Sequence, residues 1–171
     1  MQYQVRPMRP GDVDAILDAQ ALAYPEFLLE SAEFFLNRLA LAQPYCWVAQ
    51  PETGEHLLGY LVSYPWDAGL PPALDVPLDA LPPAADHWFL HDCAVVPSAQ
   101  GLGVGRALVG AAAGHAMADG CRRASLVSLA SAASYWLRLG YAPVAAQGGD
   151  LAAKLAGYGV GARYMSRAFP L

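Results

Sequence analysis

The chain has 171 residues, of which 56% are hydrophobic and only 15% are charged, and its formal net charge is −5. This length and composition suit a single globular domain spanning residues 1–171 and exclude a disordered chain. No run of Lys or Arg is longer than the pair Arg122-Arg123, so the sequence predicts no basic face for nucleic acid.

Two periodicities separate the predicted strands from the predicted helices. Apolar residues keep a helical spacing between Val13 and Leu22, whereas residues 2–6 alternate as in a strand. In chain order, we expect a strand over 2–6, a helix from 13, a helix from Ser31, strands over 46–50, 56–64 and 88–96, a helix over 104–119, a strand over 124–129, a helix over 131–140, and strands over 141–145 and 162–169. The order βααβββαβαββ predicts an α/β fold, with a mixed central sheet and helices on both faces.

The segment 67–86 separates two of these strands and contains five prolines. Its leucines and its valine make it too apolar for a purely solvated tether, and its prolines stiffen it without forming regular structure. We therefore expect it to pack over a binding pocket or against a second subunit. A flexible spacer remains the alternative.

The three cysteines, Cys46, Cys93 and Cys121, are far apart and form no CxxC pair. This spacing predicts neither a disulfide framework nor a metal site, and it favours a reducing cytoplasmic location. No apolar run approaches the roughly 18 residues that span a bilayer, and the N-terminus lacks the apolar core of a signal peptide. We expect no membrane partner.

A glycine-rich turn carries the most informative motif, Gln100-Gly101-Leu102-Gly103-Val104-Gly105-Arg106. It lies between a predicted strand and a predicted helix, where glycines let backbone N–H groups approach an anion and the helix dipole adds to the attraction. These features predict a pyrophosphate site. The turn is neither a dinucleotide fingerprint, which needs G-x-G-x-x-G, nor a Walker loop, which needs G-K-[ST].

The stretch CAVVPSAQGLGVGRAL resembles the acetyl-coenzyme A signature of the GNAT superfamily of N-acetyltransferases. The later stretch SAASYWLRLGYAP is similar to the second signature of that superfamily. The resemblance implies a GNAT fold with acetyl-CoA as co-substrate, held by backbone N–H groups of the glycine turn and by strand-like pairing with Val95 and Val96. A Val95 or Val96 amide would then stabilise the oxyanion. The cofactor residues implied are Val95, Val96, Gln100, Gly101, Leu102, Gly103, Val104, Gly105, Arg106, Ser131 and Trp136.

Direct acetyl transfer to an amine benefits from a general base and from an acid for the departing thiolate. His91 shares one strand face with His87 and Phe89, and it matches a histidine of the arylalkylamine acetyltransferases, which the segment FLHDCAVVP resembles. We predict His91 as the base; a histidine merely bonded within the sheet is the alternative. Alternation puts Asp92 on the opposite face, unless a bulge exchanges the two.

The acid is harder to assign, because the tyrosine of the second signature falls at Trp136, and tryptophan cannot donate a useful proton. Tyr135 is the candidate, although it points about 100° away on a helix. Tyr141, Tyr164 and water remain alternatives.

The acceptor side is expected to be rich in aromatic residues, which suit a cation with an apolar body. The candidates for substrate binding are Tyr24, Glu26, Tyr64, Trp66 and Phe89; core packing explains Tyr64 and Trp66 equally well. The sequence thus predicts acetyl transfer to the primary amine of a small molecule or amino acid by a monomer or homodimer. A peptide or protein N-acetyltransferase and a catalytically silent acyl-CoA-binding module are the alternatives.

Overall fold

A computed structural model describes residues 2–67, 69–145 and 149–171. These residues form a mixed seven-stranded sheet with the order β1-β2-β3-β4-β5-β7-β6. The strands are β1 (Tyr3–Pro7), β2 (Trp47–Pro51), β3 (Gly59–Trp66), β4 (His87–Val95), β5 (Arg123–Ser128), β6 (Ala142–Pro143) and β7 (Arg163–Ala168). The helices of four residues or more are α1 (Val13–Ala23), α2 (Ala32–Ala42), α3 (Val104–Ala118), α4 (Ala133–Arg138) and α5 (Gly149–Ala156).

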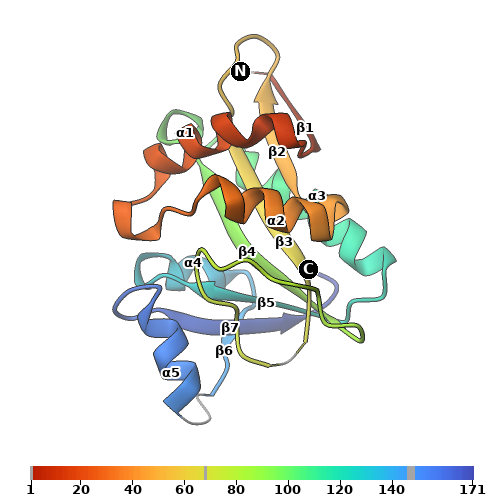
Figure 1. Cartoon of the computed structure of the whole chain (residues 1–171), viewed down its shortest axis with the longest axis vertical. Helices are drawn as coiled ribbons and strands as arrows, with labels where there is room; N and C mark the ends of the chain where they lie inside the picture. Colours follow the sequence, from red (N-terminus) through yellow and green to blue (C-terminus); the bar gives the residue numbers. More distant parts are fainter. Residues whose placement is uncertain (1, 68, 146–148) are drawn as a thin grey trace.

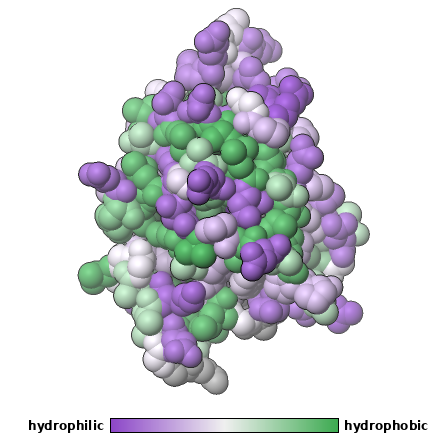
Figure 2. All heavy atoms as spheres, viewed as in Figure 1, coloured by the Kyte–Doolittle hydropathy of each residue, from purple (hydrophilic) through white to green (hydrophobic). Residues whose placement is uncertain are grey.

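Helices cover both faces of the sheet, as the sequence predicts. Helices α1 and α2 lie across one face, and α3 lies behind the sheet and packs on β2, β3 and β4 (Figure 1). On the side of α1 and α2, hydrophilic and hydrophobic residues are intermixed at the surface (Figure 2). This arrangement confirms the predicted α/β fold class.

The helix predicted from Ser31 is α2, and its Phe34, Phe35 and Leu39 are all buried. The Ser31 side chain accepts a hydrogen bond from the Phe34 N–H and so begins the helix. Leu22 is 65% exposed, because it lies in the last turn of α1 on the side away from the sheet. Helix α5 was not predicted, although its buried Leu151 and its Leu155 are spaced four residues apart.

Strand β4 changes its neighbours halfway along its length. It pairs with β3 in antiparallel fashion from His87 to Val95, whereas its parallel pairing with β5 ends at Leu90. A bulge interrupts the β3 pairing, since Val62 faces Asp92 and Ser63 faces Leu90. His91 is the extra residue, so His91 and Asp92 do not simply alternate between the two faces.

Gly59 marks a close approach between β3 and β4, because a Cβ there would lie 2.6 Å from the Ala94 carbonyl oxygen. We expect Gly59→Ala to lower the free energy of unfolding by about 1–3 kcal/mol, as overpacked sites do. Urea denaturation measures the change. Gly114→Ala in α3 is the matched control, because a Cβ there meets nothing within 4 Å, and it should stabilise the helix by about 0.5–1 kcal/mol. Equal stability of the Gly59 variant and the native protein would contradict the close approach.

Candidate active site

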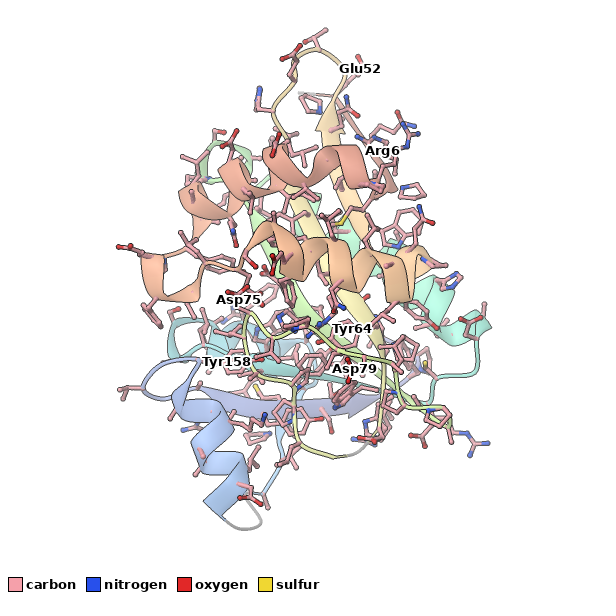
Figure 3. The ribbon with its side chains drawn as sticks, in the orientation of Figure 1. Arg6, Glu52, Tyr64, Asp75, Asp79 and Tyr158 are labelled. Carbon is pink, nitrogen blue, oxygen red and sulfur yellow. The ribbon has the colours of Figure 1, made fainter. Side chains whose placement is uncertain are left out.

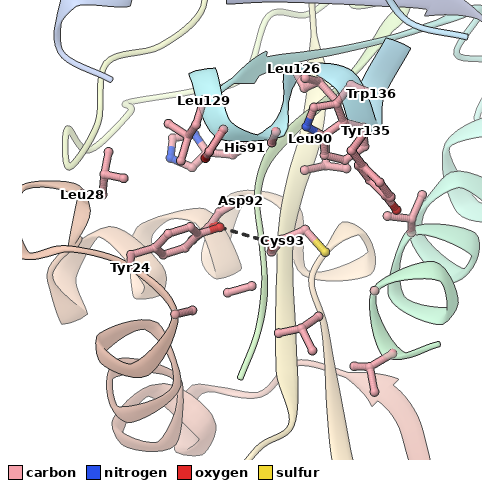
Figure 4. A pocket seen from close by; sticks show the side chains of 18 of the residues that line it. Tyr24, Leu28, Leu90, His91, Asp92, Cys93, Leu126, Leu129, Tyr135 and Trp136 are labelled. Atoms are coloured by element: carbon pink, nitrogen blue, oxygen red, sulfur yellow. Dashed lines mark hydrogen bonds between the residues drawn. The ribbon is translucent and has the colours of Figure 1, made fainter. Parts of the chain in front are cut away.

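A cavity of about 800 Å³ opens where β4 and β5 separate. The second half of β4 forms its floor, the glycine turn and α3 form one wall, and α4 forms another. The end of α1 and the chain that follows it close the remaining side. Figure 4 shows Tyr24 and Asp92 on one side of this space and Tyr135 and Trp136 across from them.

The separated edge of β4 offers backbone groups to a ligand. The Val96 N–H donates to the Leu58 carbonyl at 2.9 Å. Because pairing alternates along an antiparallel ladder, the N–H groups of Val95 and Cys93 face the opposite edge, beyond the point where pairing with β5 ends. Val95 lines the cavity, so its amide can serve the predicted pairing and oxyanion roles, whereas the Val96 amide is already used within the sheet.

The glycine turn presents further backbone amides at the start of α3. Gly103 precedes the helix with a φ of +80°, a conformation that favours glycine. The Ala107 N–H donates to the Gly103 carbonyl at 3.0 Å, so the N–H groups of Val104, Gly105 and Arg106 precede the first intrahelical hydrogen bond. This arrangement is an anion site at a helix N-terminus.

The predicted cofactor residues mostly gather on this cavity. Those that line it are Val95, Gln100, Gly101, Gly103, Val104, Gly105, Arg106, Ser131 and Trp136. Val96 is buried within the core, whereas Leu102 is 40% exposed. Neither of them belongs to the cavity lining in the described part of the chain.

His91 lies in a buried chain of hydrogen bonds. Its Nδ1 is 2.7 Å from the Tyr64 hydroxyl, and its Nε2 is 3.0 Å from both carboxylate oxygens of Glu30. The imidazole also stacks on Phe34 with a centroid distance of 4.6 Å. The side chains of His91 and Glu30 are 0% and 2% exposed. Both ring nitrogens are therefore engaged, which leaves neither of them free for an incoming amine.

Asp92 lies next to His91 but remains partly exposed and lines the cavity. Its carboxylate accepts hydrogen bonds from the Tyr24 hydroxyl at 2.7 Å and the Tyr60 hydroxyl at 2.5 Å. Burial raises the pKa of Asp92 to about 6, although the two tyrosine hydrogen bonds act in the opposite direction. A carboxylate that is ionised at neutral pH and has a raised pKa is suited to accept a proton.

Tyr135, the predicted acid, lines the cavity from α4 and is 44% exposed. Its ring meets Trp136 edge-on at a centroid distance of 4.9 Å. Tyr141 and Tyr164 are both buried, and within residues 2–67, 69–145 and 149–171 neither belongs to the cavity lining. Tyr135 is thus better placed than either of these two tyrosines.

The predicted acceptor residues are only partly brought together. Tyr24 lines the cavity, whereas Glu26 is exposed on a short helical turn. Tyr64 and Phe89 are fully buried, and the Trp66 indole donates to the Leu70 carbonyl at 2.9 Å. Among the described residues, Tyr64, Trp66 and Phe89 are not part of the cavity lining.

The lining also includes residues that were not predicted, among them Leu28, Glu30, Leu74 and Tyr158. Leu74 belongs to the proline-rich segment, whose apolar character was the available signal. Tyr158 follows α5, and its contribution depends on long-range contacts. Leu28 and Glu30 follow Tyr24-Pro25 in the sequence, and the pattern gave no reason to select them.

No group of three potential metal ligands is found among the described residues. Within the same residues, none of the helices has the length and apolar character needed to cross a bilayer.

Residues 13–141 match the acetyltransferase (GNAT) family. Because this match covers most of the chain, the protein belongs to the GNAT family of acetyltransferases, which confirms the resemblance and the expectation of acetyl-CoA as co-substrate. No curated protein matches the sequence significantly.

Solved structures share the fold at low sequence identity. The GphF GNAT-like decarboxylase in complex with isobutyryl-CoA matches with a TM-score of 0.77 and 18% identity, covering 96% of this chain and 98% of that one. Ard1 from Thermoplasma volcanium matches with a TM-score of 0.73 and 14% identity, covering both chains fully at 100%. The PaiA N-acetyltransferase from Thermoplasma acidophilum, solved with coenzyme A, matches with a TM-score of 0.69 and 14% identity, covering 99% and 100%.

Proposed function

We propose that the protein transfers an acetyl group from acetyl-CoA to the primary amine of a small molecule or amino acid. The single observation that carries this proposal is the cavity where β4 and β5 separate, because it joins an anion site to the Asp92 carboxylate. The glycine turn suits the pyrophosphate, the free β4 edge suits the pantetheine arm, and Asp92 lies toward the acceptor side. The PaiA enzyme and the GphF protein, which share the fold, were solved with coenzyme A and an acyl-CoA.

The chemistry assigns one task to each group along the cavity. The amine nitrogen attacks the thioester carbonyl carbon and loses a proton to Asp92, directly or through water. The Val95 N–H donates to the oxyanion that forms. The C–S bond then breaks, and the thiolate takes a proton from Tyr135 or from water. The structure favours Asp92 over His91 as the base, because both nitrogens of His91 are already paired.

The acceptor end is bounded by residues from separate segments, Leu28, Leu74 and Tyr158. Apolar and aromatic side chains near the Asp92 and Glu30 carboxylates suit a cationic amine with an apolar body. The residues of these separate segments favour a small acceptor over a folded protein.

Thiol release from acetyl-CoA, measured with a panel of primary amines, amino acids and short peptides, tests the proposal. We expect release with at least one small amine and an acetylated product of the corresponding mass. Release with peptides alone would assign the chain to peptide acetylation. The ribosomal-protein-S18-alanine N-acetyltransferase of Escherichia coli shares the fold of this chain. Binding of acetyl-CoA without release to any acceptor would support the silent module.

A further inference from the structure

The segment Pro72–Leu78, here called the strap, is fixed to the start of α2. The Asp75 carboxylate accepts hydrogen bonds from the Ser31 N–H at 2.7 Å and from the Ser31 hydroxyl at 2.8 Å. The Asp75 N–H in turn donates to Glu30 Oε2 at 2.8 Å. Asp75 has a φ of +56°, which L-residues adopt at a cost unless surrounding contacts hold them there.

Further contacts hold the strap on both sides of Asp75. The Asn37 side chain forms two hydrogen bonds with the backbone of Leu78, at 2.9 and 3.0 Å. The Arg38 guanidinium donates to the Val76 carbonyl at 3.0 Å. On the other side, the Tyr158 hydroxyl donates to the Pro72 carbonyl at 2.6 Å. A segment without regular structure is thus fixed over its whole length.

Leu74 lies between these attachments. Among the described residues of the strap, it is the one that lines the cavity. Tyr24, Leu28, Tyr158 and Glu30 line the same cavity. In Figure 3, Asp75 lies on the strap and Tyr158 lies below it; the strap crosses below α2 in Figure 1. The hydrogen bonds around Asp75 therefore fix the position of one apolar side chain at the acceptor end.

We propose that Leu74 is a specificity-determining residue that limits the size of the apolar body of the acceptor amine, and that Asp75 is a positioning residue for it. This inference rests on the proposed function, because it names the part of that site that selects the acceptor. An apolar wall discriminates by the methylenes it admits or excludes, and one methylene changes kcat/KM by about 10-fold or more.

The test measures kcat/KM for a series of primary amines with straight alkyl chains of increasing length. Leu74→Ala should raise the preference for longer amines over the shortest by about 10-fold, and Leu74→Phe should reverse the shift. The KM for acetyl-CoA should stay the same, because the glycine turn is elsewhere. Leu70→Ala is the matched control, since Leu70 lies in the same proline-rich segment but is 41% exposed and outside the lining, in the described part of the chain.

Asp75 variants test the positioning role. Asp75→Asn keeps an acceptor oxygen and tolerates positive φ, so its selectivity should match that of the native enzyme. Asp75→Ala should broaden selectivity as Leu74→Ala does. Asp79→Ala, at an exposed position of the proline-rich segment 67–86, should leave selectivity unchanged. An unchanged chain-length profile in both Leu74 variants overturns the proposal.

Calorimetric binding of the same amines, in the presence of CoA, separates this proposal from the proposed function. If the native protein binds these amines without transferring acetyl to them, the proposed function fails. A changed preference for chain length in the binding of amines to Leu74→Ala would still support the role of Leu74 in selecting the amine. If the native protein neither binds nor acetylates any amine of the series, both proposals fail.

Discussion

Gly103→Glu is expected to weaken acetyl-CoA binding by about 10²-fold or more, on the scale of lost charge-assisted hydrogen bonds. Gly103 lines the cavity immediately before α3. It is next to the N–H groups of Val104, Gly105 and Arg106, which precede the first intrahelical hydrogen bond. A glutamate there would place a side chain and a negative charge where the pyrophosphate is expected to bind. It would also hold a non-glycine residue at a φ of +80°.

The measurement is the calorimetric Kd for acetyl-CoA, with the free energy of unfolding measured in parallel. Gly120→Glu is the matched control, because Gly120 also has a positive φ of +88°. It follows α3 at the end opposite to the glycine turn, so this variant should lose stability but keep its affinity for acetyl-CoA. A folded Gly103→Glu protein with native affinity would show that the pyrophosphate binds elsewhere.

The order of elements was predictable because strands and helices carry different apolar periods along this chain. The glycine turn was equally visible, since its composition and its place between a strand and a helix define the anion site locally. Helix α5 was missed because it is short and is flanked by glycines such as Gly157, which favoured a loop interpretation.

The details of the acid and base could not be predicted, because they depend on one bulge and on distant partners. Strict alternation would place His91 toward one face and Asp92 toward the other, but the bulge at Val62 and Ser63 changes that relation. Glu30 meets His91 across 61 residues of sequence, and Tyr24 meets Asp92 across 68. No local sequence pattern encodes such contacts. The sequence therefore indicated the candidate acid and base residues, and the fold determines which of them lie together.

If Asp92 is the general base, Asp92→Asn is expected to lower turnover by about 10²-fold at neutral pH. Asparagine keeps an oxygen for one tyrosine hydroxyl but cannot take a proton from the amine. Turnover should partly return at high pH, where more of the amine is already deprotonated. The variant should remain folded, because burial disfavours the charge that the substitution removes.

The pH profile gives the sharper readout. Because the pKa of Asp92 is raised to about 6, the carboxyl is protonated below that pH and cannot accept a proton. Native kcat/KM should therefore rise as the pH increases through about 6, and Asp92→Asn should lack this limb of the profile. In Tyr60→Phe, the carboxylate loses a hydrogen bond that lowers its pKa, so the limb should move to higher pH while the maximal rate is largely kept.

His91→Gln provides the decisive comparison between the two candidate bases. If His91 acts as a structural link between Glu30 and Tyr64, its replacement should lower stability and leave the limb near pH 6 in place. The opposite result, with the limb lost in a folded His91→Gln protein and native turnover in Asp92→Asn, would make His91 the base. In that case the hydrogen bonds to Glu30 and Tyr64 would have to rearrange when the amine binds, because in the present structure both ring nitrogens are occupied.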